Sequence, residues 1–280
     1  MQVAFIVRAT LYTVQGGDTQ QVTQTARHLE QLGVGVDIRL THEDIDYRKY
    51  DLLHFFNIIR PADILCHIRN SHKPFVVSPL LIDYSAYDKH HRKGFAGFLF
   101  KMLPSDTIEY LKTLARYAMG RDKLMTKAYF WKGQQRSVKE VLGGAALVFP
   151  NSMMESEKLE RDYHPPAGCI PVPNGLDTEI FSADGFMRKD KNLVLCVARI
   201  EGIKNQLNLI KALNNTRYRL LIIGDPAPGQ INYYRECRRM AASNVEFIGH
   251  IPQKELVQYY RRAQVHILPS WFETCGLSSL

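Results

Sequence analysis

The first half of the chain alternates short apolar runs with stretches whose apolar residues recur at helical spacing. Residues 3–7 form such a run and predict a buried strand, and the stretch after Gly16 and Gly17 predicts a helix that Asp18 would cap. Runs of β-branched and aromatic residues bounded by turn-forming residues predict four further strands. These strands cover residues 34–40, 50–56, 74–79 and 145–150.

The strongest break in this pattern lies at residues 165–175, which hold four prolines and end in an Asn-Gly turn. We place a domain boundary there, between an N-terminal domain of residues 1–170 and a C-terminal domain of residues 171–280. In the second domain, strands at 193–198, 218–223, 245–248 and 265–269 alternate with helices at 205–213, 233–242 and 254–262. Such alternation forms right-handed βαβ units and a parallel sheet. The sequence therefore predicts an α/β fold of two Rossmann-like, doubly wound domains. Ligands would bind in a cleft between them, at the carboxyl ends of the strands.

Composition excludes several other classes of protein. The 280 residues are 45% apolar and 23% charged, which is ordinary for a globular protein and unlike a disordered or collagen-like chain. All apolar runs are shorter than the roughly 18 to 20 residues that span a bilayer. Arg8 interrupts the first run before it could serve as a signal peptide, so we expect a cytoplasmic location.

The net charge of +8 is concentrated in one segment. Residues 89–139 contain twelve Lys or Arg and three acidic residues, which leaves 24 basic and 25 acidic residues in the rest of the chain. Apolar residues at helical spacing from Ile108 to Met119 predict that this segment is a helical insertion in the first domain.

Three interpretations of the basic insertion are open from the sequence. It could be a solvated helix face, or it could dock on anionic lipid headgroups or a lipid-phosphate acceptor, with interleaved aromatic residues at the interface. Nucleic-acid binding is the third interpretation. We expect no nucleic-acid partner, because no known nucleic-acid-binding motif is present. We favour the anionic membrane surface, which would place the protein on the inner face of the plasma membrane. The aromatic residues are Phe95, Phe98, Phe130 and Trp131.

Two cations flank a turn at the start of the C-terminal domain. Arg199 ends a predicted strand, Gly202 lies in the turn, and Lys204 and Asn205 open the next helix. This spacing gathers two positive charges, a glycine that permits close approach and the free amides of a helix N-terminus, which together suit a diphosphate. A solvated surface pair would explain the same residues.

Two weaker candidates lie at other predicted strand ends. Glu273 follows the last predicted strand by four residues and could hold sugar hydroxyls, or it could simply cap its loop. Gly16 and Gly17 could approach a phosphate from the first domain. They lack the full dinucleotide-binding pattern, and a tight turn explains them equally well.

Five motifs, in order along the chain, resemble those of glycosyltransferase family 4, whose members have the GT-B fold. Residues 193–205 (LVLCVARIEGIKN) resemble the V-G-R-L-x-x-x-K-N signature, and residues 172–181 resemble the P-N-G-V-D-x-x-x-F linker. Residues 149–152, 222–225 and 269–277 resemble the serine-bearing strand end, the I-x-G-x-G turn and the P-S-x-x-E-x-F-G-L motif. The resemblance implies retaining, metal-independent transfer of a sugar from a UDP- or GDP-type nucleotide sugar, with no separate cofactor. A glycan or lipid-linked acceptor in cell-surface polysaccharide or lipopolysaccharide synthesis would fit it.

The same resemblance implies roles for individual residues. Arg199 and Lys204 would neutralise charge on the leaving diphosphate, and Glu273 would hold the donor sugar. Asp83 is a candidate on the acceptor side, although a turn carboxylate explains it as well. The donor-binding candidates are Gly16, Gly17, Gly202, Asn205, Gly224, His250, Ile251, Cys275, Gly276 and Leu277.

Two departures from the family pattern bear on activity. The second glutamate of the E-x7-E motif would fall at position 281, so the chain resembles a member cut inside that motif. Asp225 and the prolines that follow it stand where the family has a second glycine, which would reshape the nucleotide pocket. The alternative function is therefore a catalytically incompetent nucleotide-binding fragment or an assembly partner.

Overall fold

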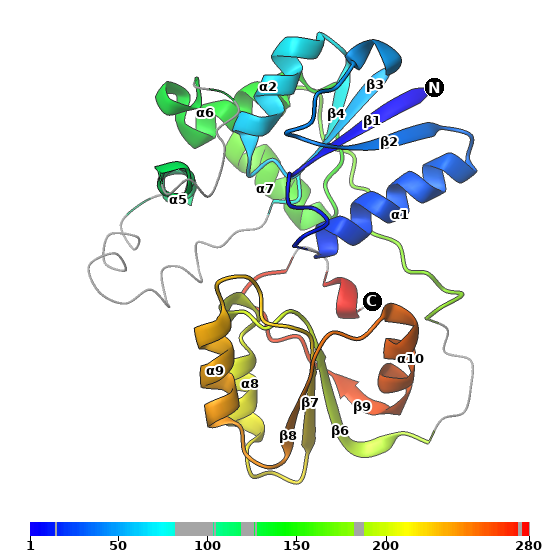
Figure 1. Cartoon of the computed structure of the whole chain (residues 1–280), viewed down its shortest axis with the longest axis vertical. Helices are drawn as coiled ribbons and strands as arrows, with labels where there is room; N and C mark the ends of the chain where they lie inside the picture. Colours follow the sequence, from blue (N-terminus) through cyan, green and yellow to red (C-terminus); the bar gives the residue numbers. More distant parts are fainter. Residues whose placement is uncertain are drawn as a thin grey trace. The chain divides into compact units, whose positions relative to one another are not determined.

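The computed structural model describes residues 1–14, 16–81, 103, 105–118, 126, 128–181, 188–273 and 276–279. They form two compact units, Met1–Asn174 and Gly175–Leu280, each built around one parallel sheet (Figure 1). The boundary predicted after residue 170 lies a few residues before the end of the first unit.

The first unit contains a five-stranded sheet in the order β2-β1-β3-β4-β5. All neighbouring strands run parallel, and this order is that of the flavodoxin-like doubly wound fold. The strands are β1 (Gln2–Val7), β2 (Gly35–Leu40), β3 (Leu52–Phe56), β4 (Phe75–Ser78) and β5 (Leu147–Val148). The helices are α1 (Gly17–Gln31), α2 (Pro61–Ser71), α5 (Ser105–Ala118), α6 (Tyr129–Gly144) and α7 (Met153–Tyr163), with a 3-10 turn at Tyr47–Lys49.

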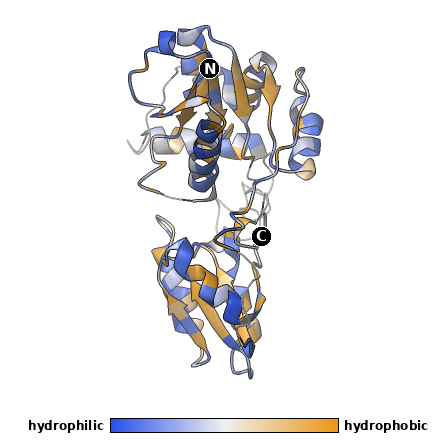
Figure 2. Cartoon of the chain, turned by 90° about the vertical axis from the view of Figure 1, so that its right-hand side faces the viewer, coloured by the Kyte–Doolittle hydropathy of each residue, from blue (hydrophilic) through white to orange (hydrophobic). Residues whose placement is uncertain are grey.

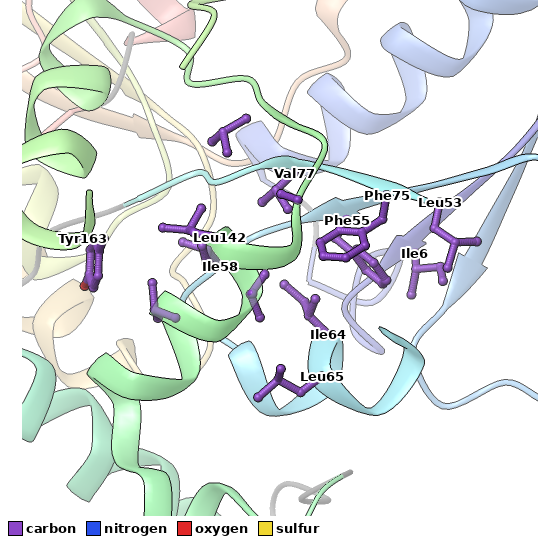
Figure 3. Close-up of a cluster of buried hydrophobic side chains, with 14 of the residues drawn as sticks. Ile6, Leu53, Phe55, Ile58, Ile64, Leu65, Phe75, Val77, Leu142 and Tyr163 are labelled. Atoms are coloured by element: carbon purple, nitrogen blue, oxygen red, sulfur yellow. The ribbon is translucent and has the colours of Figure 1, made fainter. Parts of the chain in front are cut away.

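Both faces of this sheet are covered. Successive side chains of a strand point to opposite faces, so Phe5 packs in the core beneath α1 while Ile6 packs in a larger core on the side of α2, α6 and α7. Figure 3 shows part of the larger core, in which the rings of Phe55 and Phe75 lie edge to face with centroids 5.5 Å apart. Burial on both faces explains why β1 reads as a continuous apolar run rather than as an alternating one.

The second unit contains a four-stranded parallel sheet in the order β8-β7-β6-β9. Helices α8 and α9 pack on one face of this sheet and α10 on the other (Figure 1). Figure 2 shows the apolar strands and the hydrophilic outer surfaces of the helices. The strands are β6 (Asp190–Val197), β7 (Arg219–Ile223), β8 (Val245–Ile248) and β9 (Ala263–His266). The helices are α8 (Gln206–Leu213), α9 (Ile231–Met240) and α10 (Gln253–Arg262), with 3-10 turns η2 (Gly202–Lys204) and η3 (Leu277–Ser279).

Every strand predicted from the sequence is present, and the doubly wound α/β prediction is confirmed. The prediction that Asp18 caps α1 was wrong. Gly16 is the N-cap, in an extended conformation, and Asp18 lies in the first turn. The reason is Arg8, which follows β1 and holds the Asp18 carboxylate in an ion pair with an Nε–Oδ2 distance of 2.5 Å.

The predicted helical insertion corresponds, in its described part, to α5 and the beginning of α6. Within α6, Gly133 has φ 68° and ψ −176°, which separates the first turn from the rest of the helix. Asp83 and most of the basic residues between 89 and 127 lie outside the described residues. None of the helices that the structure describes is long and apolar enough to span a bilayer.

Candidate functional site

The carboxyl ends of the four strands of the second unit form one edge of its sheet, and the loops there carry most of the residues selected from the sequence. A backbone hydrogen bond of 2.9 Å from the Trp271 amide to the Ile203 carbonyl joins the loop after β9 to turn η2. By strand, the predicted residues in these loops are Arg199, Gly202, Lys204 and Asn205 after β6, Gly224 after β7, His250 and Ile251 after β8, and Glu273, Gly276 and Leu277 after β9. Cys275 lies outside the described residues.

Lys204 and Glu273 form an ion pair, with 2.5 Å between Nζ and Oε1. The hydroxyl of Ser270 donates to the same carboxylate oxygen at 2.6 Å. The side chains of Lys204 and Glu273 are 19% and 29% exposed, so solvent still reaches both. The structure thus joins two residues that the sequence analysis selected separately, and it adds Ser270, which the sequence analysis did not select.

Arg199 is held at both its backbone and its side chain. Its Nη2 lies 3.1 Å from Oε1 of Glu201, and its carbonyl accepts a hydrogen bond from Nε2 of Gln206 at 2.8 Å. Glu201, which the sequence analysis did not select, is 13% exposed. The guanidinium therefore has a fixed position beside turn η2.

The amides at the start of α8 are less available than the sequence suggested. The Gly202 amide lies 3.4 Å from Oε1 of Gln230, and the Leu207 amide donates to the Tyr233 hydroxyl at 3.0 Å. The expectation of free helix amides was therefore wrong for Leu207 of α8, and the Gly202 amide of turn η2 faces Gln230, the N-cap of α9. Asn205 has a positive φ of 60° and is the N-cap of α8. Positive charge at this edge therefore comes mainly from the side chains of the two cations.

The backbone conformation and the close packing at residue 224 explain why this residue is glycine. Its φ is 140°, and a Cβ atom placed on it would lie 2.2 Å from the Ala198 carbonyl oxygen. The next residue, Asp225, joins the neighbouring loops. Its carbonyl accepts from the Ile200 amide at 2.9 Å, and its Oδ1 accepts from the His250 amide at 3.2 Å. The loop after β7 thus fixes the positions of the loops after β6 and β8.

His266, the last residue of β9, joins the sheet to turn η3. The Val197 amide donates to its Nε2 at 3.3 Å, and its Nδ1 lies 3.4 Å from the Ser279 hydroxyl. Burial lowers the pKa of His266, and an Nε2 that accepts must carry no proton. The ring is therefore neutral with its proton on Nδ1. Tyr260 supports the same turn through a 2.7 Å hydrogen bond from its hydroxyl to the Ser278 carbonyl.

In the first unit, Gly16 and Gly17 lie at the start of α1 in a loop that Arg8 holds together. Besides Asp18, the Arg8 guanidinium donates to the carbonyls of Thr10 at 2.8 Å and Val14 at 2.6 Å. This loop is therefore ordered by its own side chains.

A second buried carboxylate in the first unit supports two strand ends. Glu155, near the start of α7, accepts the amides of Leu81 and Asn151, each at 2.6 Å, through its two oxygens. Burial raises the pKa of Glu155, and the two amide bonds oppose that shift. Asn151 also forms a reciprocal pair of hydrogen bonds with the side-chain amide of Gln21 of α1, at 2.8 and 2.9 Å.

Among the described residues, no three His, Cys, Asp or Glu side chains gather into a possible metal site.

Comparison with solved structures defines the class of fold. The chain resembles a sucrose-phosphate synthase from Thermosynechococcus elongatus with a TM-score of 0.72, covering 99% of this chain and 77% of that one at 17% identity. It also resembles HepE from Anabaena, solved with UDP and glucose, with a TM-score of 0.65. That match covers 98% of this chain and 76% of the HepE chain at 14% identity. The fold is therefore the GT-B type of glycosyltransferases, as the sequence predicted.

Sequence comparison identifies similar proteins. Residues 177–280 match the family model Glycosyl transferases group 1. A D-inositol 3-phosphate glycosyltransferase from Acidothermus cellulolyticus is 27% identical over 164 residues, which are 50% of this chain and 37% of that protein. A GDP-mannose-dependent alpha-(1-6)-phosphatidylinositol monomannoside mannosyltransferase from Mycolicibacterium smegmatis is 30% identical over 129 residues. These residues are 41% of this chain and 34% of that protein. The chain thus spans little more than a third of these relatives. The resemblance to family 4 glycosyltransferases is confirmed.

Proposed function

We propose that the protein is a retaining glycosyltransferase that moves a sugar from a nucleotide diphosphate donor to an acceptor hydroxyl. The observation that carries this proposal is the ion pair of Lys204 with Glu273, beside the fixed Arg199, at the strand ends of the group 1 unit. Two cations suit a diphosphate, and a carboxylate suits the hydroxyls of a sugar attached to it. Relatives named as glycosyltransferases and mannosyltransferases support the same class of reaction.

In the proposed reaction, the bond between the anomeric carbon of the sugar and the diphosphate oxygen breaks. The acceptor oxygen forms the new bond to that carbon, on the same face, and the proton of the acceptor hydroxyl passes to the departing diphosphate oxygen. Negative charge grows on the departing diphosphate, where Arg199 and Lys204 would stabilise it. Charges that the fold positions in advance stabilise such a leaving group most strongly. Backbone bonds position both cations: the Lys204 amide donates to the Glu201 carbonyl, and the Arg199 carbonyl accepts from Gln206.

We assign the rest of the donor to neighbouring loops. The turn at His250 and Ile251 would contact the base, and the amides near Gly276 and Leu277 would bind sugar or phosphate oxygens. Gly16 and Gly17 would contribute from the first unit. HepE was solved with UDP, and the Mycolicibacterium relative is named as GDP-mannose-dependent, so UDP and GDP are the nucleotides to test.

We extend the proposal to a lipid-linked or glycan acceptor at an anionic membrane surface on the cytoplasmic side. A relative named for a phosphatidylinositol mannoside supports this class of acceptor. On α6, Trp131 is 78% exposed, and Arg136 and Lys139 are exposed. Lys132 is paired with Glu140 and so contributes less free charge. A basic helix with an exposed indole suits an anionic lipid surface.

Thermal unfolding with nucleotides, followed by a transfer assay, tests the proposal. A ligand at about 100 times its Kd stabilises a folded protein by roughly 2.7 kcal/mol. We expect UDP or GDP to raise Tm, AMP to leave it unchanged, and the matching nucleotide sugar to lose its sugar to an acceptor or to water. No shift with either diphosphate in a folded sample, together with no release of sugar, would contradict the proposal.

A further inference from the structure

Both cations of the candidate site are already paired with carboxylates of the same unit. Arg199 Nη2 lies 3.1 Å from Glu201 Oε1, and Lys204 Nζ lies 2.5 Å from Glu273 Oε1. The formal charges of these four groups sum to zero. An incoming diphosphate therefore meets cations that must exchange one anionic partner for another.

The two ion pairs differ in their exposure to water. The side chains of Glu201, Lys204 and Glu273 are between 13% and 29% exposed, whereas that of Arg199 is 39% exposed. Charges that are partly withdrawn from water are screened less by salt and solvent than charges on an open surface. The carboxylate therefore competes with phosphate more strongly at Lys204 than at the more exposed Arg199.

The positions of the two glutamates are set in different ways. The Glu201 carbonyl accepts the Lys204 amide at 2.9 Å, which positions the backbone of Glu201 at the start of turn η2. The Ser270 hydroxyl donates to Glu273 Oε1 at 2.6 Å. Glu273 thus keeps a hydrogen-bond donor when Lys204 turns towards a phosphate, and both carboxylates stay close enough to take the cations back.

We propose that Glu201 and Glu273 are resident counter-ions that a nucleoside diphosphate must displace, and that they weaken its binding so that it leaves after transfer. The inference rests on the proposed function and deepens it. Release of product limits the turnover of many enzymes. A site with two unopposed cations would hold the diphosphate product longer than this one does.

Isothermal titration of the purified protein with UDP, GDP and UDP-glucose tests this inference. Glu201→Gln keeps the shape of the side chain and an oxygen acceptor for Arg199 but removes the charge, whereas Glu201→Ala removes both. Glu236→Gln, an exposed position in α9, is the matched control for loss of one negative charge from the unit.

We expect Glu201→Gln to tighten binding of the preferred diphosphate by about three- to tenfold. We expect the control to change it less than about twofold, since exposed charges are strongly screened. Glu273→Gln should tighten binding of the diphosphate while lowering the preference for UDP-glucose over UDP, because it loses the sugar contact as well. Stopped-flow measurement should show slower nucleotide release from Glu201→Gln.

Other results separate the two proposals. If the wild-type protein binds a nucleoside diphosphate but Glu201→Gln binds it equally or more weakly, the counter-ion role is overturned and the proposed function stands. Weaker binding by Glu201→Ala with unchanged binding by Glu201→Gln would make Glu201 a positioning residue for Arg199 only. If the folded wild-type protein binds neither UDP nor GDP, both proposals fall.

Discussion

The Ala198 carbonyl oxygen lies only 2.2 Å from the position that a Cβ atom on Gly224 would take. The backbone after β6 therefore leaves no room for a Cβ atom at the end of β7, and only glycine fits at residue 224. Since Arg199 directly follows Ala198, this close contact helps to set the position of the guanidinium.

We predict that Gly224→Ala destabilises the second unit by about 2 to 4 kcal/mol, because it adds a backbone clash to an unfavourable φ. Urea unfolding measures the loss. Gly175→Ala is the control, since a Cβ there meets no atom within 4 Å. Equal stability of the two variants would contradict the packing described for Gly224.

We predict that Arg199→Ala and Lys204→Ala each lower kcat by at least about a hundredfold, as loss of one preorganised charge stabiliser does. Initial rates of sugar release from the nucleotide sugar measure the effect. Lys211→Ala, at an exposed position of α8, should retain wild-type turnover. Full activity of Arg199→Ala would remove its proposed role in stabilising the leaving group.

We predict that Arg8→Ala destabilises the first unit by about 2 to 4 kcal/mol, because it leaves the Asp18 carboxylate unpaired in a partly buried place. The side chains of Arg8 and Asp18 are 13% and 21% exposed. The matched control is Arg48→Ala, which breaks an ion pair with Asp46 whose arginine is 90% exposed, so its cost should be much smaller than that of Arg8→Ala. Chemical denaturation of both variants makes the comparison, and similar losses would show that Arg8 does not organise its loop.

We predict that His54 makes the first unit less stable as pH falls below about 6.5. Burial lowers the pKa of His54 from 6.5 to about 3, so the folded state binds fewer protons than the unfolded state between these values. The free energy of unfolding then falls by about 1.4 kcal/mol for each pH unit below 6.5, and the contribution is fully present above that pH. His54→Gln should reduce this slope by the contribution of one bound proton, about 1.4 kcal/mol per pH unit. Parallel pH profiles for the two proteins would contradict the assignment.

We predict that binding to anionic liposomes falls when Arg136 and Lys139 are both changed to Glu, and falls further with Trp131→Ala. Binding should weaken between about 50 and 300 mM salt, because the Debye length shrinks over this range. Lys211→Glu, on the second unit, controls for total charge. Co-sedimentation measures the binding. Equal partitioning onto neutral and anionic liposomes would contradict membrane docking and support the interpretation of the insertion as a solvated helix face.

Periodicity and breakers located all the strands that the structure describes, and the central strands β1 and β6 are continuous apolar runs because they are buried on both faces. Two of the helices that the structure describes were not predicted. Helix α2 begins with Pro61 at a first helical position, and α7 begins with Ser152 as N-cap, whose hydroxyl accepts the amide of Glu155. Both signals were present in the sequence. The sequence analysis did not use the proline, and it used Ser152 only as part of a family motif.

The candidate site shows a different limit. Spacing along the chain selected Arg199, Lys204 and Glu273, but it gave no reason to pair the last two, which are 69 residues apart. Glu201, Ser270 and the acceptors on α9 are ordinary polar residues in turns and helices, and their partners depend on how the sheet brings the loops together. Such contacts follow from tertiary packing, and local sequence patterns do not encode them.

The central position of β6 in its sheet, with β9 beside it, has a kinetic consequence. β6 and β9 pair Asp190 with Ala263, the most distant partners along the chain in this sheet, whereas β6, β7 and β8 pair over shorter separations. Closing the longer loop carries the greater entropic cost, and non-local pairings slow folding. During refolding, the unit can therefore build most of its sheet before Lys204 and Glu273 meet. Recovery of ligand binding would then lag behind recovery of secondary structure.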